Sequence, residues 1–219
     1  MADTQTTPTL TVYADPVCPF CYLGRASLEE YLNAADDPPA VQWRQFDLRG
    51  YKRAPDGTIS EDVDDGKDEA YFEQARQNVE RLREKYDVEM IDFEDVPETD
   101  SWDAQQASLF VEQTESAETF RQFYEGLFAA YWRDGRDIAD PDVLVAVAEE
   151  SGVDDPGSIR DAITDDALES ELRERFAEGQ QLGISGVPTF VYGDHAARGA
   201  VPPDHLARLV GDQISASES

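Results

Sequence analysis

The chain has 219 residues, of which 40% are apolar and 10% aromatic, so it can bury a core and is not a disordered acidic tail. Its 48 acidic residues outnumber 18 basic ones, and the net charge of -30 far exceeds the magnitude of about 2–8 usual for a small domain. The acids are spread along the whole chain, so they coat the surface and exclude nucleic acid and anionic lipid as partners. We interpret this acidity as adaptation to molar salt; an acidic docking face is the alternative.

The first elements predict a βαβ unit. Residues 1–8 are polar and lack the basic and apolar regions of a signal peptide, and no apolar run approaches the roughly 18 residues of a membrane span. Both observations predict a cytoplasmic protein. Residues 9–15 are expected to form a strand, 19–34 a helix and 40–48 a second strand. That order favours parallel pairing of the two strands.

A long helical stretch is predicted next, and the pattern then returns to β. Residues 49–66 are rich in Gly, Pro and Asp and predict a loop. Helical spacing follows over 67–86, 102–112 (with Ser101 as N-cap), 117–133, 141–150, 156–164 and 166–182. The aromatic stripe of 117–133 is more typical of a core than of a substrate groove. Strands are expected over 188–192 and 196–200, joined by a turn, and a last helix over 203–214.

The only two cysteines, Cys18 and Cys21, lie between the first strand and the first helix. Free N–H groups and the helix macrodipole favour negative charge there, so we expect Cys18 to be an exposed, reactive thiolate. Cys21, three residues on, lies on the same helix face and can close a disulfide. Pro19 suits the first helical turn. Buried core cysteines, a structural disulfide, or half of a zinc site with His195 and His205 remain less favoured alternatives.

A second informative stretch runs from Ile184 to Val191 and contains Gly-Val-Pro-Thr-Phe. A proline that begins a strand lacks an N–H donor, and a cis bond there would expose the preceding backbone. Together with the Cys-x-x-Cys, this run resembles the thioredoxin fold, in which a cis-proline loop lies against the dithiol. The long helical insertion resembles the DsbA family. Within that family, Asp15–Gly24, the Gly-Val-Pro-Thr-Phe run and Gly199–Pro203 resemble the FrnE-type branch.

The resemblance implies an α/β, thioredoxin-like fold with a large inserted α-helical subdomain. Residues 1–64 and 183–219 would form the thioredoxin-like domain, and residues 65–182 the insertion. Cys18 would be the nucleophile and Cys21 the resolving thiol, with Pro19 and Phe20 tuning the redox potential. Pro188 would be the cis-proline, and the backbone of Val187 would bind an extended client strand.

The implied function is thiol–disulfide exchange with protein or small-molecule disulfides and thiols, without a metal or organic cofactor. A recycling redox partner is expected; direction of electron flow and oligomeric state stay open. Phe20 replaces the histidine that precedes the second cysteine in periplasmic DsbA, so strong oxidising power does not follow. One alternative is an isomerase or transferase that uses a thiol cofactor, as do 2-hydroxychromene-2-carboxylate isomerases and kappa-class glutathione transferases, which have serine near position 18. The other is a non-catalytic, client-binding chaperone on the same fold.

Overall fold

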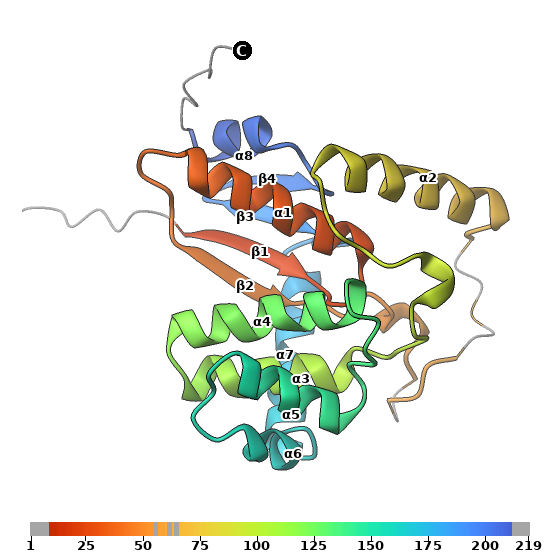
Figure 1. The fold of residues 1–219 in the computed structure, drawn as a ribbon, viewed down its shortest axis with the longest axis vertical. Helices are drawn as coiled ribbons and strands as arrows, with labels where there is room; N and C mark the ends of the chain where they lie inside the picture. The colour runs from red at the N-terminus through yellow and green to blue at the C-terminus, as the bar shows by residue number, and fades with distance from the viewer. Residues whose placement is uncertain (1–8, 55–56, 61–62, 64–65, 212–219) are drawn as a thin grey trace, which may run out of the picture.

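The computed structural model describes residues 9–54, 57–60, 63 and 66–211, and within them four strands and eight α-helices (Figure 1). The strands are β1 (Leu10–Ala14), β2 (Val41–Gln45), β3 (Thr189–Tyr192) and β4 (His195–Arg198). The helices are α1 (Pro19–Ala34), α2 (Glu69–Lys85), α3 (Trp102–Thr114), α4 (Ala117–Trp132), α5 (Pro141–Glu150), α6 (Ile159–Ala162), α7 (Asp166–Gln181) and α8 (Pro203–Val210). None of these helices is long and apolar enough to cross a membrane.

The strands form one mixed sheet in the order β2-β1-β3-β4. β1 pairs in parallel with β2, with Leu10 opposite Val41, so the predicted βαβ unit is confirmed. β3 runs antiparallel to β1, and β4 antiparallel to β3. β1 therefore lies between β2 and β3, so the sheet brings together segments that are more than 140 residues apart in the sequence.

Side chains of β1 alternate between the two faces of the sheet, as the pleat requires. Val12 and Ala14 belong to the main core, which α1 and α4 also line. Tyr13 points the other way, into a smaller cluster with Phe46 and Ile184. On that face Gly179 of α7 lies against the Tyr13 ring.

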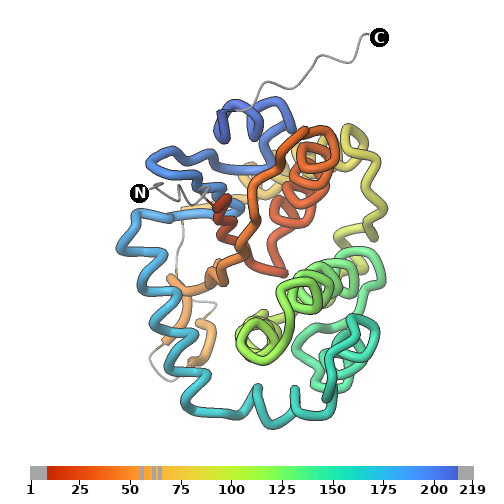
Figure 2. Tube along the Cα trace, turned by 90° about the vertical axis from the view of Figure 1, so that its left-hand side faces the viewer, coloured from red at the N-terminus to blue at the C-terminus, as the bar shows by residue number. Residues whose placement is uncertain are grey.

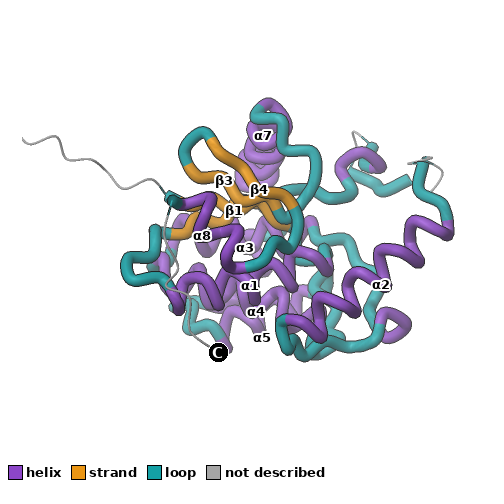
Figure 3. Tube along the Cα trace, turned by 90° about the horizontal axis from the view of Figure 1, so that it is seen from above, coloured by secondary structure: helices purple, strands orange, loops and turns teal. Residues whose placement is uncertain are grey.

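The helices between β2 and β3 surround the sheet on more than one side. α3, α4, α5 and α6 form a group beside the sheet, and α7 returns from this group toward β3 (Figure 2). α2 packs on α1 through its C-terminal half, and its N-terminal half extends away from the body (Figure 3). The aromatic stripe of α4 is buried, so its interpretation as core is confirmed; its members include Phe123, Tyr124, Phe128 and Trp132.

The α/β, thioredoxin-like fold with inserted helices is confirmed, but several boundaries differ. β2 ends at Gln45, three residues before the expected end, since the chain there turns toward the loop after β1. α8 ends at Val210, followed by Gly211 in the left-handed conformation (φ 87°), and the expected residues 212–214 lie outside the described part. Ser101 occupies the N-cap of α3, but its side chain makes no cap bond. The division into domains at residues 64–65 and 182–183 stays a prediction.

Candidate active site

The turn between β1 and α1 places both cysteines at the N-terminus of α1. Cys18 is the N-cap residue with an extended backbone (φ −90°, ψ 116°), and Pro19 follows in the first turn. The Cys18 N–H donates to the Asp15 carbonyl at 3.0 Å, and the Cys18 carbonyl accepts from the Cys21 N–H at 3.0 Å. Cys18 makes no side-chain cap bond, so its sulfur lies at the positive end of the helix without accepting from a helix N–H group.

The expectation that Cys18 is exposed is wrong. Its exposed fraction is 3%, that of Cys21 is 1%, and both thiols are free. The Cys18 Sγ lies 3.6 Å from the Val187 carbonyl, which accepts its weak hydrogen bond. Both cysteines belong to the main apolar core, where a thiol packs as a small apolar group, so only a narrow edge of Cys18 meets solvent.

The proline loop lies directly against α1. The Val187–Pro188 peptide bond is cis. Gly24 of α1 faces this loop: a Cβ there would lie 3.0 Å from Cγ of Pro188, so glycine permits the close approach. The structure therefore brings together Cys18, Cys21, Val187 and Pro188. Pro19 and Phe20, which are half-buried, lie between the cysteines on the first turn of α1.

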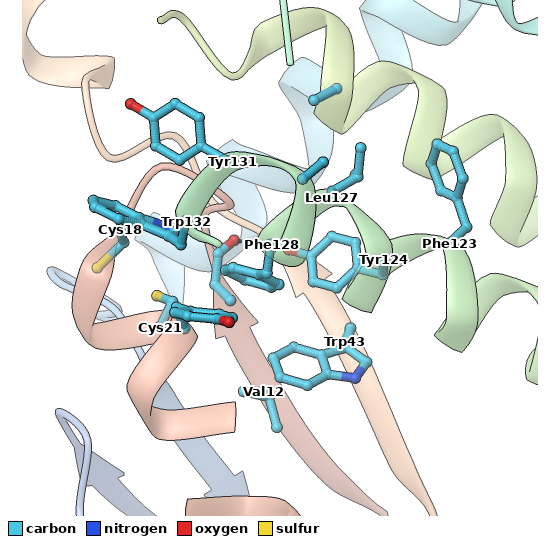
Figure 4. Close-up of a cluster of buried hydrophobic side chains, with 14 of the residues drawn as sticks. Val12, Cys18, Cys21, Trp43, Phe123, Tyr124, Leu127, Phe128, Tyr131 and Trp132 are labelled. Carbon is cyan, nitrogen blue, oxygen red and sulfur yellow. Dashed lines mark hydrogen bonds between the residues drawn. The ribbon is translucent and has the colours of Figure 1, made fainter. Parts of the chain in front are cut away.

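Aromatic side chains of α4 support the turn from behind. The Trp132 indole N–H donates to the Pro16 carbonyl at 2.9 Å, and the Tyr124 hydroxyl to the Ala14 carbonyl at 3.2 Å. Figure 4 shows these rings, with Phe128, on the α4 side of the two cysteines. The inserted helices thus fix the position of the dithiol as well as filling the core.

Asp15 is a functional candidate that the sequence analysis missed. Its side chain is fully buried, and its two oxygens accept hydrogen bonds from the Val17 N–H at 3.1 Å and the Leu48 N–H at 2.9 Å. Burial raises the pKa of Asp15 to about 7, although hydrogen bonds from Leu48, Ser101 and Val17 each lower it. The one sequence signal was an acidic residue ending an apolar strand, directly before the dithiol turn.

Asp15 also interacts with the resolving thiol. Burial raises the pKa of Cys21 well above its ordinary value, and the neighbouring Cys18 and the Asp15 carboxylate raise it further. The Asp15 N–H bonds to Cys21 and partly offsets this. Burial therefore favours the protonated form of the Cys21 thiol, and the Asp15 carboxyl, whose pKa is raised to about 7, lies near enough to favour that form further.

A Cys-x-x-Cys at the N-terminus of the first helix of a βαβ unit, facing a proline loop that begins an antiparallel strand, defines a thioredoxin-fold dithiol protein. The comparisons agree with this class. Residues 9–211 match the model of the DSBA-like thioredoxin domain, and the chain belongs to that family.

Several proteins are similar over nearly their whole length. The Bacillus subtilis (strain 168) protein YwbO is 29% identical over 211 residues, which cover 93% of this chain and 96% of YwbO. A probable DsbA oxidoreductase, SCO1869 from Streptomyces coelicolor, has a TM-score of 0.74 at 22% identity, with 97% and 94% of the two chains covered. A 2-hydroxychromene-2-carboxylate isomerase has a TM-score of 0.72 at 18% identity, with 93% of each chain covered. At these identities the solved structures establish the fold alone.

Proposed function

We propose that the protein is a thiol–disulfide oxidoreductase that exchanges disulfides with protein clients through Cys18-Pro19-Phe20-Cys21. The observation that carries this proposal is the pair of free thiols at the N-terminus of α1, with the Cys18 sulfur 3.6 Å from the Val187 carbonyl. The buried Asp15 supports it, because a carboxyl group that titrates near neutral pH beside a thiol is suited to proton transfer.

The reaction takes two exchange steps. In the first, the Cys18 thiolate attacks one sulfur of the client disulfide, forms a mixed disulfide, and releases the other client sulfur as a thiolate. In the second, the Cys21 thiol passes its proton to the Asp15 carboxylate, its sulfur bonds to Cys18, and the remaining client thiolate leaves. The client is reduced by two electrons and the enzyme disulfide is formed; the reverse sequence oxidises a client.

The Val187 carbonyl gives the client a place to bind. In the resting enzyme this carbonyl accepts from the Cys18 thiol. A thiolate or mixed disulfide at Cys18 has no proton to donate, so reaction frees the carbonyl for an N–H group of an extended client strand. Binding of the strand and reaction at Cys18 would thus occur together, with Phe20 and Pro19 bordering the reacting sulfur.

A second candidate function is a thiol-cofactor-dependent isomerase or transferase. It is favoured by the similarity of fold to 2-hydroxychromene-2-carboxylate isomerase. The second cysteine favours dithiol chemistry, because a bound thiol cofactor needs no resolving partner. A non-catalytic, client-binding chaperone on this fold is a third candidate.

Reduction of insulin disulfides separates the three candidates. The wild type should be active, Cys18→Ser inactive, and Cys21→Ser strongly impaired because it cannot resolve. No activity in either wild type or Cys18→Ser favours the chaperone, and activity of equal size in both would show that Cys18 is not the nucleophile. Conjugation of glutathione-type substrates that survives Cys21→Ser favours the isomerase or transferase.

The finer assignments also belong to this proposal. The motifs Asp15–Gly24 and Gly199–Pro203 support placement in the FrnE-like branch, and the net charge of -30 supports work in molar salt inside the cytoplasm. The redox potential of the Cys18–Cys21 pair would set the direction of electron flow. A value near -270 mV indicates a reductase and one near -120 mV an oxidase.

A further inference from the structure

Arg53, on the loop after β2, makes a buried clamp between two carboxylates. Its side chain is 6% exposed. Its Nε and Nη2 donate to Asp47 at 2.7 and 3.2 Å, and its Nη1 and Nη2 donate to Asp100 at 2.7 and 2.8 Å. Nη1 also donates to the Gly57 carbonyl at 3.0 Å, and the guanidinium lies over the Trp102 ring. Two bidentate pairs on one guanidinium fix the positions of both partners.

The two residues that Arg53 holds each precede a donor to Asp15. Asp47 is followed by Leu48, whose N–H donates to Asp15 Oδ2 at 2.9 Å. Asp100 is followed by Ser101, whose side chain also lowers the pKa of Asp15 by hydrogen bonding. The Ser101 hydroxyl makes no N-cap bond to α3, and its oxygen accepts from Nε2 of Gln105 at 3.0 Å, so its own proton is left to be donated toward Asp15.

We propose, resting on the function proposed above, that Arg53 is a positioning residue of the active site: by clamping Asp47 and Asp100 it holds the Leu48 N–H and the Ser101 hydroxyl on the Asp15 carboxylate. These two donors favour the ionised form of Asp15, which is the form that can accept the Cys21 proton. Arg53 acts on Asp15 only through the segments that carry Asp47 and Asp100, and so it is not itself a catalytic residue.

The charges around Asp15 act in the same direction. The negative charge of Asp47 raises the pKa of Asp15. Loss of Arg53 would therefore leave this charge without its ion-pair partner, and would also release the two donors that Arg53 holds in place. From α1, Cys18 and Cys21 face Asp15; from α4, Tyr124 and Tyr131. Burial raises the pKa of Cys21 and of Tyr124 well above their ordinary values, and that of Tyr131 to about 12, so none of these three titrates near pH 7.

The test follows the second exchange step as a function of pH. One equivalent of an aromatic disulfide, 5,5′-dithiobis(2-nitrobenzoate), releases one coloured thiolate when Cys18 attacks and another when Cys21 resolves. In the wild type the second rate should rise with pH through a midpoint near the pKa of Asp15, about 7. Asp15→Asn should lose this rise.

Arg53→Gln should shift the midpoint upward by at least ~1 pH unit, because hydrogen bonds to a charged group are among the stronger ones. Below both midpoints the second step should then be about tenfold slower, while release of the first thiolate is unchanged. Arg53→Lys keeps the positive charge but loses the planar guanidinium that pairs with both carboxylates, so it should shift the midpoint as well. Arg173→Gln is the matched control: Arg173 also lies over Trp102, but its ion pair goes to Glu169.

The outcomes separate this proposal from the function itself. If the wild type releases neither thiolate, the dithiol function fails. If it releases both but shows no rise near pH 7, the roles of Asp15 and Arg53 both fail while the dithiol function stands; if Arg53→Gln keeps the wild-type midpoint, only the role of Arg53 fails. The role of Arg53 also fails if Arg53→Lys has the wild-type midpoint, since the positive charge alone would then suffice to hold Asp47 and Asp100. It fails as well if Arg173→Gln shifts the midpoint by the same amount as Arg53→Gln.

Asp100→Asn provides a second test in case the Arg53 variants do not fold. Asp100 is 34% exposed, so Asp100→Asn perturbs a less buried group than Arg53 does. It weakens the clamp only on the Ser101 side. If the Arg53 variants do not fold, an upward shift of the midpoint in Asp100→Asn supports the proposal, and an unchanged midpoint overturns it.

Discussion

Asp15→Asn should change how the stability of the protein depends on pH. A carboxyl group whose pKa is raised by folding contributes stability that is fully present below its unfolded pKa and is lost as the pH rises through its folded pKa. For Asp15 these values are 3.8 and about 7. The window of about three pKa units corresponds to roughly 4 kcal/mol of unfolding free energy, lost between about pH 4 and pH 7.

Asparagine cannot ionise, so the variant should lack this loss. Val17 and Leu48 donate to different oxygens of Asp15, and the asparagine amide nitrogen would face one of these donors. That mismatch costs about 1–3 kcal/mol at every pH. The variant should therefore be less stable than the wild type near pH 4 and should gain on it by up to ~4 kcal/mol toward pH 8. Urea unfolding of the reduced proteins at fixed KCl measures the difference. A constant difference across this range would show that Asp15 does not titrate there in the folded state.

Three further predictions test the thiol roles, the proline loop and the surface charge. Cys21→Ala should trap client proteins on Cys18 as adducts on non-reducing gels, while Cys18→Ala traps none; equal trapping would contradict this assignment of nucleophile and resolving thiol. Gly24→Ala should cost about 1–3 kcal/mol and slow exchange, because its Cβ would lie 3.0 Å from Pro188. Gly186→Ala, whose Cβ would meet nothing within 4 Å, is its control, and equal effects would refute the packing argument. Thermal midpoints should rise steeply toward about 1 M KCl, where the Debye length is only ~3 Å, and a flat response would contradict adaptation to salt.

Local patterns predicted the βαβ unit and the dithiol turn, whereas the thioredoxin-like fold was predicted from the resemblance of the two motifs to a known family. Apolar periodicity marks α1 and α4, and a strand–helix–strand order of that length leaves few options besides a parallel pair. The spacing of Cys18 and Cys21 marks the reactive turn because both the helix N-terminus and the thiol pair are encoded within a few residues. Their roles in catalysis stay predictions.

Tertiary contacts decided what the sequence could not show. The burial of Cys18 could not be predicted locally, because the Val187 carbonyl that covers its sulfur lies 169 residues away along the chain. Ser101 occupies the predicted N-cap position but makes no cap bond; its hydroxyl accepts from Gln105 Nε2 and also lowers the pKa of Asp15. The Arg53 clamp joins residues 47 apart, and in a chain with 48 acidic residues no local pattern identifies Asp100 as its partner.

Salt and pH should act on different acidic residues of this protein. Exposed carboxylates repel one another through solvent, so molar KCl screens them. Asp15 is buried, and its pKa is set by burial and by hydrogen bonds within the fold, which dissolved ions do not reach. The pH-dependent difference between wild type and Asp15→Asn should therefore keep its size and midpoint at low and at molar KCl, while the stability of both proteins rises. Parallel urea titrations at the two salt concentrations test this. A midpoint that moves by a full pH unit with salt would mean that surface charge, and not the buried environment, holds the pKa of Asp15 near 7.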